Sequence, residues 1–404
     1  MIRNDDPESR LEYSQGTDGT MTNPARQHTK IGLVLSGGGA RGAYQVGVLR
    51  AIARFLPRHA PIPFKVICGT SAGAINAASL ASHAGDFQCG VARLARIWGN
   101  LHTKDVYRSD FLSVLGNSFR WLGALFVTGF ARSRRTSLLD NAPLGRLLER
   151  RIEFGRIAGE IDAGHLDAVC VTASGYASGQ SISFYQGRES LAPWSRVRRA
   201  GFKTQLQLPH LMGSAAIPFV FPPVWIEREH FGDGSMQQLA PISPALHLGA
   251  DRVLVIKVGD PRRQADPSDA AAKEFPSLAQ VAGRVLDSIF LDSLDMDLER
   301  LARINATLNV VPRDVIEKHT LGLRHVDTLV IAPSQRMDDI ALEHAHAMPW
   351  PVRSLMHGIG ALRPGGGNVL SYLLFERAYC RALMRMGWQD AMANKDAIMA
   401  FIAG

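Results

Sequence analysis

A serine flanked by small residues is the first candidate for chemistry in this chain. Gly69-Thr70-Ser71-Ala72-Gly73 has the form GxSxG, with a strand-like apolar run at 66–68 before it and an alanine-rich, helix-forming run at 74–82 after it. A serine on a tight turn between a strand and a helix holds its hydroxyl exposed, in the arrangement called a nucleophile elbow. We therefore predict that Ser71 is a nucleophile.

A glycine-rich segment could supply the second requirement, a site for negative charge. Residues 36–42 are Ser-Gly-Gly-Gly-Ala-Arg-Gly; they follow a strand-like run at 31–35 and open a segment at 43–55 with apolar residues at helical spacing. Free N–H groups at the start of a helix attract anions. Amides arranged around a developing oxyanion each stabilise a transition state by about 3 to 4 kcal/mol, so this segment could form an oxyanion hole.

The same glycines, Gly37, Gly39 and Gly42, also spell GxGxxG, the fingerprint of dinucleotide-binding folds. That fingerprint needs an acidic residue about 20 positions further on to bind the ribose. No Asp or Glu occurs between Gly19 and Gly85, which argues against a nicotinamide cofactor. The chain also lacks GxxxxGK[ST], so a phosphate-binding P-loop is excluded.

An aspartate between two glycines is the third feature. Asp233, in Phe231-Gly232-Asp233-Gly234-Ser235, follows a proline-rich run at 217–223 and a short strand-like run at 224–226. Alone, such an aspartate would be an ordinary turn former. Beside a serine nucleophile and a glycine-rich loop, it becomes a candidate base.

These three motifs, in this order, resemble the patatin-like phospholipases. The resemblance covers about residues 30 to 250, and the matching segments are 37–42, 69–73, 213–218 and 233–234. One departure is Ser235, where the family usually has Gly or Ala. A serine is small enough to fit there and could hydrogen-bond the carboxylate.

The resemblance implies a two-member catalytic dyad, with Ser71 as nucleophile and Asp233 as base. The oxyanion segment would comprise Gly37, Gly38, Gly39 and Arg41. It also implies phospholipase A or lysophospholipase activity without calcium, so we expect neither a metal nor a cofactor. A base that takes the serine proton directly should be tuned by partial burial.

A Ser-His-Asp triad is the mechanistic alternative, because histidines follow Asp233 in the order Ser, Asp, His. The candidates are His247, His319, His325 and His357. Sequence spacing leaves this alternative open.

Composition fits a large enzyme with an anionic partner. The 404 residues are 46% hydrophobic and 20% charged, enough for a sizeable core, and the formal net charge is +8. Nucleic acid and lipid surfaces are both anionic. Because the chain has no zinc-finger, RNP-like or homeodomain-like pattern, and its arginine-rich stretches adjoin apolar ones, we expect a phospholipid or other acyl lipid as partner and no nucleic acid.

The cysteines and the N-terminal residues indicate a compartment. Four widely spaced cysteines in apolar contexts predict free thiols in a reducing environment. Residues 1–29 are polar and lack a hydrophobic signal segment, which predicts a disordered leader. We expect a cytoplasmic protein, peripheral at a membrane and without a transmembrane segment; export by a route without a cleavable signal stays open.

Alternation of strands and helices predicts the fold. Strand-like runs occur at 31–35, 66–68, 168–172, 181–185, 253–258 and 329–332. Strands separated by helices form a mostly parallel sheet covered on both faces. We therefore predict an α/β fold with three α/β/α layers, patatin-like, and a helical C-terminal extension.

The domain boundaries follow from these runs. We predict a catalytic domain at 30–259, a linker or surface loop at 260–275 and a mainly helical extension at 276–404 with one strand near 328–332. Within the extension, 277–308 has the pattern of an amphipathic helix and the glycine-rich 364–368 that of a loop between helices.

Residues 111–130 combine aromatic and aliphatic side chains and precede a cluster of arginines. The candidate membrane or lid residues are Trp121, Phe126, Arg132, Arg134 and Arg135. Polar residues and a glycine interrupt the run, which makes it a poor membrane span. An apolar face beside arginines suits an anionic interface, where each basic residue contributes about 1 kcal/mol. We predict a lid or docking surface over Ser71; a buried hairpin that caps the core is the alternative.

The function that we predict is a serine acyl hydrolase that cleaves fatty-acyl esters of phospholipids or lysophospholipids through an acyl-serine intermediate. Two alternatives stay open: an acyltransferase or thioesterase that uses the same acyl-serine, and a catalytically idle lipid-binding protein. The sequence makes no prediction of head-group preference or oligomeric state.

Overall fold

The central strands have apolar side chains on both faces. In the computed structural model, which describes residues 29–108, 137–259, 275, 277–312, 315, 323–363 and 365–403, strand β1 spans Ile31–Leu35. Its Leu33 and Leu35 belong to one apolar cluster and Val34 to another. Because successive side chains of a strand point to opposite faces, a strand buried on both sides needs helices on both faces of its sheet.

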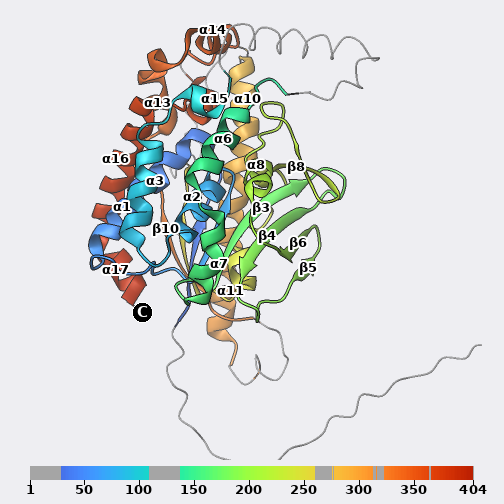
Figure 1. Ribbon diagram of the computed structural model, residues 1–404, viewed down its shortest axis with the longest axis vertical. Helices are drawn as coiled ribbons and strands as arrows, with labels where there is room; N and C mark the ends of the chain where they lie inside the picture. Colours follow the sequence, from blue (N-terminus) through green and yellow to red (C-terminus); the bar gives the residue numbers. More distant parts are fainter. Residues whose placement is uncertain are drawn as a thin grey trace, which may run out of the picture.

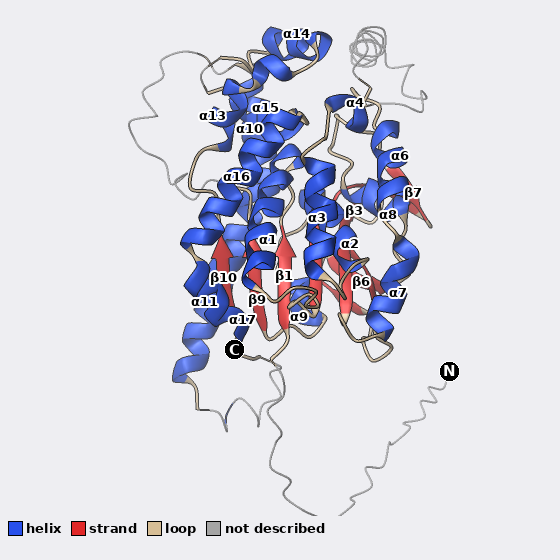
Figure 2. Cartoon of the chain, turned by 60° about the vertical axis from the view of Figure 1, so that its left-hand side comes forward, coloured by secondary structure: helices blue, strands red, loops and turns tan. Residues whose placement is uncertain are grey.

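Among the described residues, ten strands form one sheet in the order β10-β9-β1-β2-β3-β4-β6-β5, and β7 and β8 pair off this path. The parallel part consists of β10 (Asp327–Ile331), β9 (Arg252–Ile256), β1, β2 (Val66–Thr70) and β3 (Ala168–Gly175). Figure 2 shows β10, β9 and β1 side by side, with their arrowheads toward α10 and α15 and their amino ends toward α9.

The other half of the sheet is mostly antiparallel. It consists of β4 (Ser181–Gly187), β5 (Trp194–Arg196), β6 (Arg199–Lys203), β7 (Val224–Ile226) and β8 (Glu229–Asp233). β4 runs antiparallel to β3 and parallel to β6, while β5–β6 and β7–β8 are antiparallel pairs.

Helices cover both faces of the parallel part. One face carries α1 (Ala43–Phe55), α2 (Ala72–Ala81), α3 (Phe87–Trp98) and α16 (Arg377–Ala393), with α1 packed against α16 and α3 (Figure 1). The other face carries α9 (Ser243–His247) and α11 (Ser293–Val310), whose apolar residues join the cluster that contains Val34. The predicted three-layer α/β fold with a mostly parallel sheet is therefore confirmed.

The remaining helices lie around this core. They are α4 (Thr103–Val106), α6 (Ala142–Arg151), α7 (Phe154–Asp162), α8 (Leu208–Ser214), α10 (Leu278–Asp287), α13 (Met337–Glu343), α14 (Trp350–Gly358), α15 (Gly367–Leu373) and α17 (Lys395–Ala403). Across the described residues, none of the helices has both the length and the apolar character to cross a membrane.

The C-terminal third contributes to the same core. Strand β10 extends the parallel sheet beside β9, and α16 packs along α1. The predicted leader at 1–29 and the predicted linker at 260–275 lie almost entirely outside the described residues. The division of the chain into domains stays a prediction.

Candidate active site

Ser71 sits on a strained turn at the carboxyl end of β2. Its backbone φ is 55°, and it caps the N-terminus of α2. A positive φ is uncommon outside glycine and marks strain that the surroundings must hold. A Cβ on Gly69 would overlap the carbonyl of Gly73, and one on Gly73 would overlap the carbonyl of Leu35. The two glycines of GxSxG are therefore required because α2 lies directly against the strands.

A second serine holds this turn in place. The Ser71 amide donates to Oγ of Ser214 at 2.9 Å, and the Ser214 hydroxyl donates to the carbonyl of Thr172 at 2.6 Å. Ser214 ends α8 and is fully buried. Sequence reasoning assigned no role to Ser214 itself; the signal was its place in the segment 213–218.

The sheet topology brings Asp233 next to Ser71. β2 pairs with the first part of β3, up to Thr70 opposite Thr172, and β4 occupies the other edge of β3. Beyond the end of β2, β8 pairs with β3 and sets Asp233 opposite Ala173. Along β3, Asp233 therefore takes the position next to the Thr70–Thr172 pair, where the chain leaves β2 and continues into Ser71.

The carboxyl of Asp233 is fully buried, and burial raises its pKa to about 7. Hydrogen bonds from Ser71 and Ser235 act in the opposite direction, because they favour the ionised form. The Ser235 amide donates to Oδ1 at 3.0 Å, whereas Oδ2 makes no well-formed hydrogen bond to a described residue. A carboxyl with a pKa near neutrality and an open oxygen suits proton transfer.

The glycine-rich loop approaches the same point. Gly39–Gly42 form a single 3₁₀ turn before α1, so the amides of Gly38 and Gly39 precede or open a helix and have no partner within it. Gly39 has φ 55°, and a Cβ there would overlap the carbonyl of Tyr372. A Cβ on Gly37 would meet the hydroxyl of Ser235. This loop therefore lies beside the Asp233 turn and leaves no room for larger residues.

Arg41 fastens that loop to the C-terminal helices. Its amide donates to the Gly38 carbonyl at 3.1 Å. Its buried guanidinium donates to Oγ of Ser371 at 2.8 Å and to the side chain of Asn368 at 2.5 Å. It also lies 3.8 Å from Asp287, which accepts a hydrogen bond from Asn368. The sequence predicted Arg41 as part of the oxyanion segment and missed these partners.

An apolar cavity opens on both Ser71 and Gly39. Its lining is otherwise formed by Ala72, Ile75, Ile97, Trp98, Leu101, Val106, Leu144, Leu147, Ala215, Ile217, Phe221 and Phe375. Ser71 is only 2% exposed: it lines this cavity, among apolar residues of several elements. The cavity residues are spread over the chain, and the sequence analysis missed them.

The histidines of the alternative triad lie elsewhere or outside the described residues. His247 ends α9, which leads into the amino end of β9, and His325 precedes β10. β9 and β10 are parallel to β1 and β2, so both histidines lie at the amino ends of the strands, whereas Ser71 lies at the carboxyl ends. His357 is exposed on α14, and His319 is not among the described residues.

The described neighbours of Asp233 also bear on the alternative triad. The side chains that shift its pKa belong to Ser71 and Ser235, and neither is a histidine.

The lid candidates cannot be placed in the structure. Trp121, Phe126, Arg132, Arg134 and Arg135 fall within residues 109–136, outside the described part of the chain. Searched over its described residues, the structure contains no group of three or more His, Cys, Asp or Glu side chains placed to hold a metal ion.

Comparison with known families gives this arrangement a context. A family model described as patatin-like phospholipase matches residues 33–246, more than half of the chain and all of the motifs above. The chain belongs to the patatin-like phospholipase family. This membership confirms the predicted family. It is consistent with a nucleophile elbow, a glycine-rich loop and an aspartate that lie together at the carboxyl ends of β1 and β2.

Among curated proteins, this patatin-like chain is similar to two fungal ones. It is 48% identical over 54 residues to lysophospholipase NTE1 of Chaetomium globosum and 52% identical over 54 residues to lysophospholipase nte1 of Aspergillus terreus. Each match covers 13% of this chain and 3% of the fungal protein. The chain therefore spans only a small part of the length of these relatives.

Two solved structures resemble the patatin-like chain more broadly and more distantly. VipD from Legionella pneumophila is 12% identical with a TM-score of 0.35, over 91% of this chain and 67% of that one. The human GIVD cytosolic phospholipase A2, in complex with methyl gamma-linolenyl fluorophosphonate, is 10% identical with a TM-score of 0.40, over 93% of this chain and 59% of that one. Both TM-scores are low, so these structures say nothing about the activity of this chain.

Proposed function

We propose that this patatin-like protein is a serine hydrolase that cleaves fatty-acyl esters of phospholipids or lysophospholipids. The observation that carries the proposal is the apolar cavity that opens on Ser71, beside a buried carboxyl whose pKa is about 7. Its apolar lining suits the acyl chain of a lipid better than a polar group. Membership of the family and the similarity to fungal lysophospholipases support the same substrate class.

In the first step, Oγ of Ser71 attacks the acyl carbonyl carbon while Asp233 accepts the hydroxyl proton. The carbonyl oxygen becomes an oxyanion, which the amides of Gly38 and Gly39 stabilise by hydrogen bonds. The tetrahedral intermediate then collapses, the ester C–O bond breaks, and Asp233 returns the proton to the leaving alcohol. The product that leaves is a lysolipid or a glycerophosphoryl compound, and the acyl group stays on Ser71.

In the second step, water attacks the acyl-serine and Asp233 accepts its proton. Collapse of the second intermediate releases the fatty acid and returns the proton to Oγ of Ser71. Burial of Asp233 serves both steps, because a carboxyl with an ordinary pKa would be too weak a base to take a serine proton at neutral pH.

An anionic membrane surface is the proposed place of action. This part of the proposal rests on the sequence of 111–135, with its aromatic residues and Arg132, Arg134 and Arg135, which lies outside the described residues. Replacing the three arginines by glutamate is expected to weaken hydrolysis of anionic vesicles and to spare a short-chain soluble ester. Unchanged vesicle binding at every salt concentration would contradict this part alone.

The decisive experiment combines labelling with product analysis. A fluorophosphonate probe is expected to modify Ser71, located by mass spectrometry of the labelled peptide. The protein is then incubated with a mixed phospholipid and lysophospholipid panel, with and without an alcohol acceptor. Free fatty acids support the hydrolase, transfer to the alcohol supports an acyltransferase, and absence of labelling together with absence of products supports an idle lipid-binding protein.

A further inference from the structure

A second cavity lies beside the antiparallel half of the sheet and shares no lining residue with the apolar one. It is enclosed by the β5–β6 hairpin, β4, the segment 237–240, α9 and α11. Its volume of about 130 Å³ is several times the roughly 30 Å³ that one water occupies in the liquid. The cavity therefore has room for a small polar molecule.

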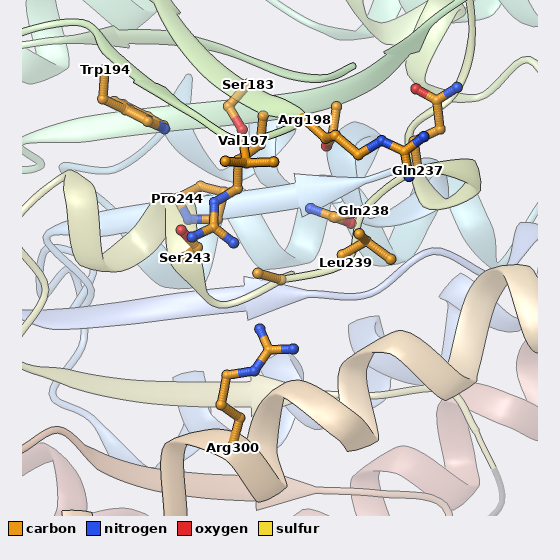
Figure 3. Close-up of a pocket in the computed structure, with 13 residues that line it drawn as sticks. Ser183, Trp194, Val197, Arg198, Gln237, Gln238, Leu239, Ser243, Pro244 and Arg300 are labelled. Carbon is orange, nitrogen blue, oxygen red and sulfur yellow. The ribbon is translucent and has the colours of Figure 1, made fainter. Parts of the chain in front are cut away.

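Three arginines line this cavity. Arg198 and Arg199 come from the β5–β6 hairpin, and Arg300 comes from α11 on the opposite wall. Figure 3 shows the Arg300 side chain rising from its helix toward the cavity and Arg198 reaching toward Gln237 from the other side. The residues that line the cavity include no Asp or Glu, so positive charge converges on it from two separate elements.

One carboxylate nearby offsets part of this charge. Asp297 lies 3.7 Å from the Arg300 guanidinium and accepts a hydrogen bond from the Ile242 amide. Burial raises the pKa of Asp297, while the Ile242 amide, Arg300 and Arg199 act in the opposite direction and favour its ionised form. Three guanidinium groups against one carboxylate leave the cavity with net positive charge.

Two buried polar atoms of the lining have no hydrogen-bond partner in the part of the chain that the structure describes. Nε of Arg199 and Oε1 of Gln237 are buried, and neither makes a hydrogen bond to a described residue. A buried donor or acceptor without a partner is costly, so each of these groups needs water or a bound molecule as its partner. Arg199 requires an acceptor such as a phosphate oxygen, and Gln237 requires a donor such as a hydroxyl.

The hairpin that carries two of the arginines is strained. Two residues, Val197 and Arg198, connect β5 to β6, and Arg198 has φ 59°. Glycine or asparagine normally occupies such a position. A strained arginine at the mouth of a cavity is a typical sign of a functional site.

We propose that this arginine-lined cavity binds a small phosphate ester that carries hydroxyl groups. The guanidinium groups bind the phosphate oxygens by charge-assisted hydrogen bonds, and Oε1 of Gln237 accepts from a hydroxyl. The ligand is either a soluble phosphate ester or a phospholipid head group. Its binding does not depend on the proposed hydrolase activity, because Ser71 and Asp233 do not line this cavity.

The test measures binding to the whole 404-residue chain. Isothermal titration calorimetry uses glycerol 3-phosphate and inorganic phosphate up to about 10 mM, and co-sedimentation uses phosphatidylcholine vesicles with and without phosphatidylglycerol. The variants are Arg199→Gln and Arg300→Gln. Arg303→Gln is the matched control, because Arg303 lies on the same helix, exposed and paired with Glu299. Thermal unfolding reports whether each variant is folded; Arg300 is an exposed side chain, so Arg300→Gln is expected to fold.

The expected result is that glycerol 3-phosphate binds, and that Arg199→Gln and Arg300→Gln each weaken it at least about tenfold while Arg303→Gln does not. The ligand is instead a lipid head group if glycerol 3-phosphate does not bind and the same two variants lose phosphatidylglycerol-dependent sedimentation. The proposal is overturned if the protein binds neither the soluble phosphates nor the phosphatidylglycerol vesicles, or if binding is the same in Arg300→Gln and in the control. In those cases the cavity holds water.

Discussion

The Ser71 amide and the Ser214 hydroxyl form the hydrogen bond that holds the strained turn, 2.9 Å from nitrogen to oxygen. Because Ser214 also donates to the carbonyl of Thr172, Ser214→Ala removes two buried hydrogen bonds to the backbone. We expect a loss of about 2 kcal/mol in the free energy of unfolding and a clear fall in kcat on a soluble ester. Ser82→Ala removes another buried serine hydrogen bond, to the carbonyl of Ser79, and should lower stability alone. Equal kcat in the two variants would show that Ser214 has no part in positioning Ser71.

The proposed dyad makes a prediction about single substitutions. Ser71→Ala and Asp233→Asn are each expected to lower ester hydrolysis by about a thousandfold or more, because residues that act as a unit lose most activity together. Initial rates on a short-chain ester measure this. Alanine at each of the four histidines, His247, His319, His325 and His357, should leave rates close to wild type. High turnover by folded Asp233→Asn would point to a histidine base.

The pKa of Asp233 predicts a pH profile. Since Asp233 accepts a proton in its ionised form and has a pKa of about 7, kcat/KM on a soluble ester should rise with pH through an apparent pKa near that value. Below it the carboxyl is protonated and cannot act as a base. A profile that stays flat from pH 5 to about 9 would mean that another group limits the reaction.

The same carboxyl predicts a pH-dependent cost in stability. Asp233 has a pKa of about 7 in the folded protein against an ordinary value of 3.8. Below about pH 4 it is protonated in both states; as pH rises toward 7 the unfolded chain loses the proton first, so stability falls. Asp233→Asn removes this cost and should stabilise the protein at pH 8 by a few kcal/mol, on the order of the pKa difference, with little change at pH 4. Urea unfolding at both pH values measures it, and equal shifts at both would contradict the assignment.

The contacts of Arg41 predict an effect on rate from a residue outside the dyad. Arg41→Lys keeps the positive charge near Asp287 but loses the planar fork that reaches Ser371 and Asn368. The glycine loop should then be held less well, and kcat should fall by about tenfold to a hundredfold with a smaller change in KM. Arg54→Lys, on the exposed face of α1, is the control. A fall in melting temperature with unchanged kcat would make Arg41 purely structural.

Local sequence patterns predicted the elements around the site well. The strand predicted at 31–35 has the same bounds in β1, and the helix predicted at 43–55 has the same bounds as α1. β2 and β3 begin where predicted but run on to Thr70 and Gly175. Residues such as Ser174 and Gly175 have weak strand preference, and β3 extends through them because β8 pairs there.

The helix predicted at 277–308 shows where periodicity fails. The structure has α10, a π turn at Ser288–Asp292 and then α11. Since a π turn inserts an extra residue, it rotates the side chains of α11 about the helix axis relative to those of α10. One continuous apolar stripe therefore cannot face the core in both helices. Leu294 and Leu301 are buried, whereas Leu278, Val281 and Val285 are exposed.

Contacts between distant parts of the chain could not be predicted. The partners of Arg41 lie 327 to 331 positions away, and Asn368 belongs to a glycine-rich segment that reads as a loop but opens α15. Neither residue has a local pattern that indicates its partner. The apolar cavity has the same character, because its lining comes from residues between Gly39 and Phe375.

The attachment of the glycine loop to α15 also orders events during protein synthesis. The ribosome releases Ser71 and Asp233 long before it has made Gly367–Leu373, the helix whose residues hold Arg41. A nascent chain can therefore present its serine and aspartate while the loop at 37–42 still lacks its anchor. The proposed hydrolase would then reach its full rate only after α15 has emerged.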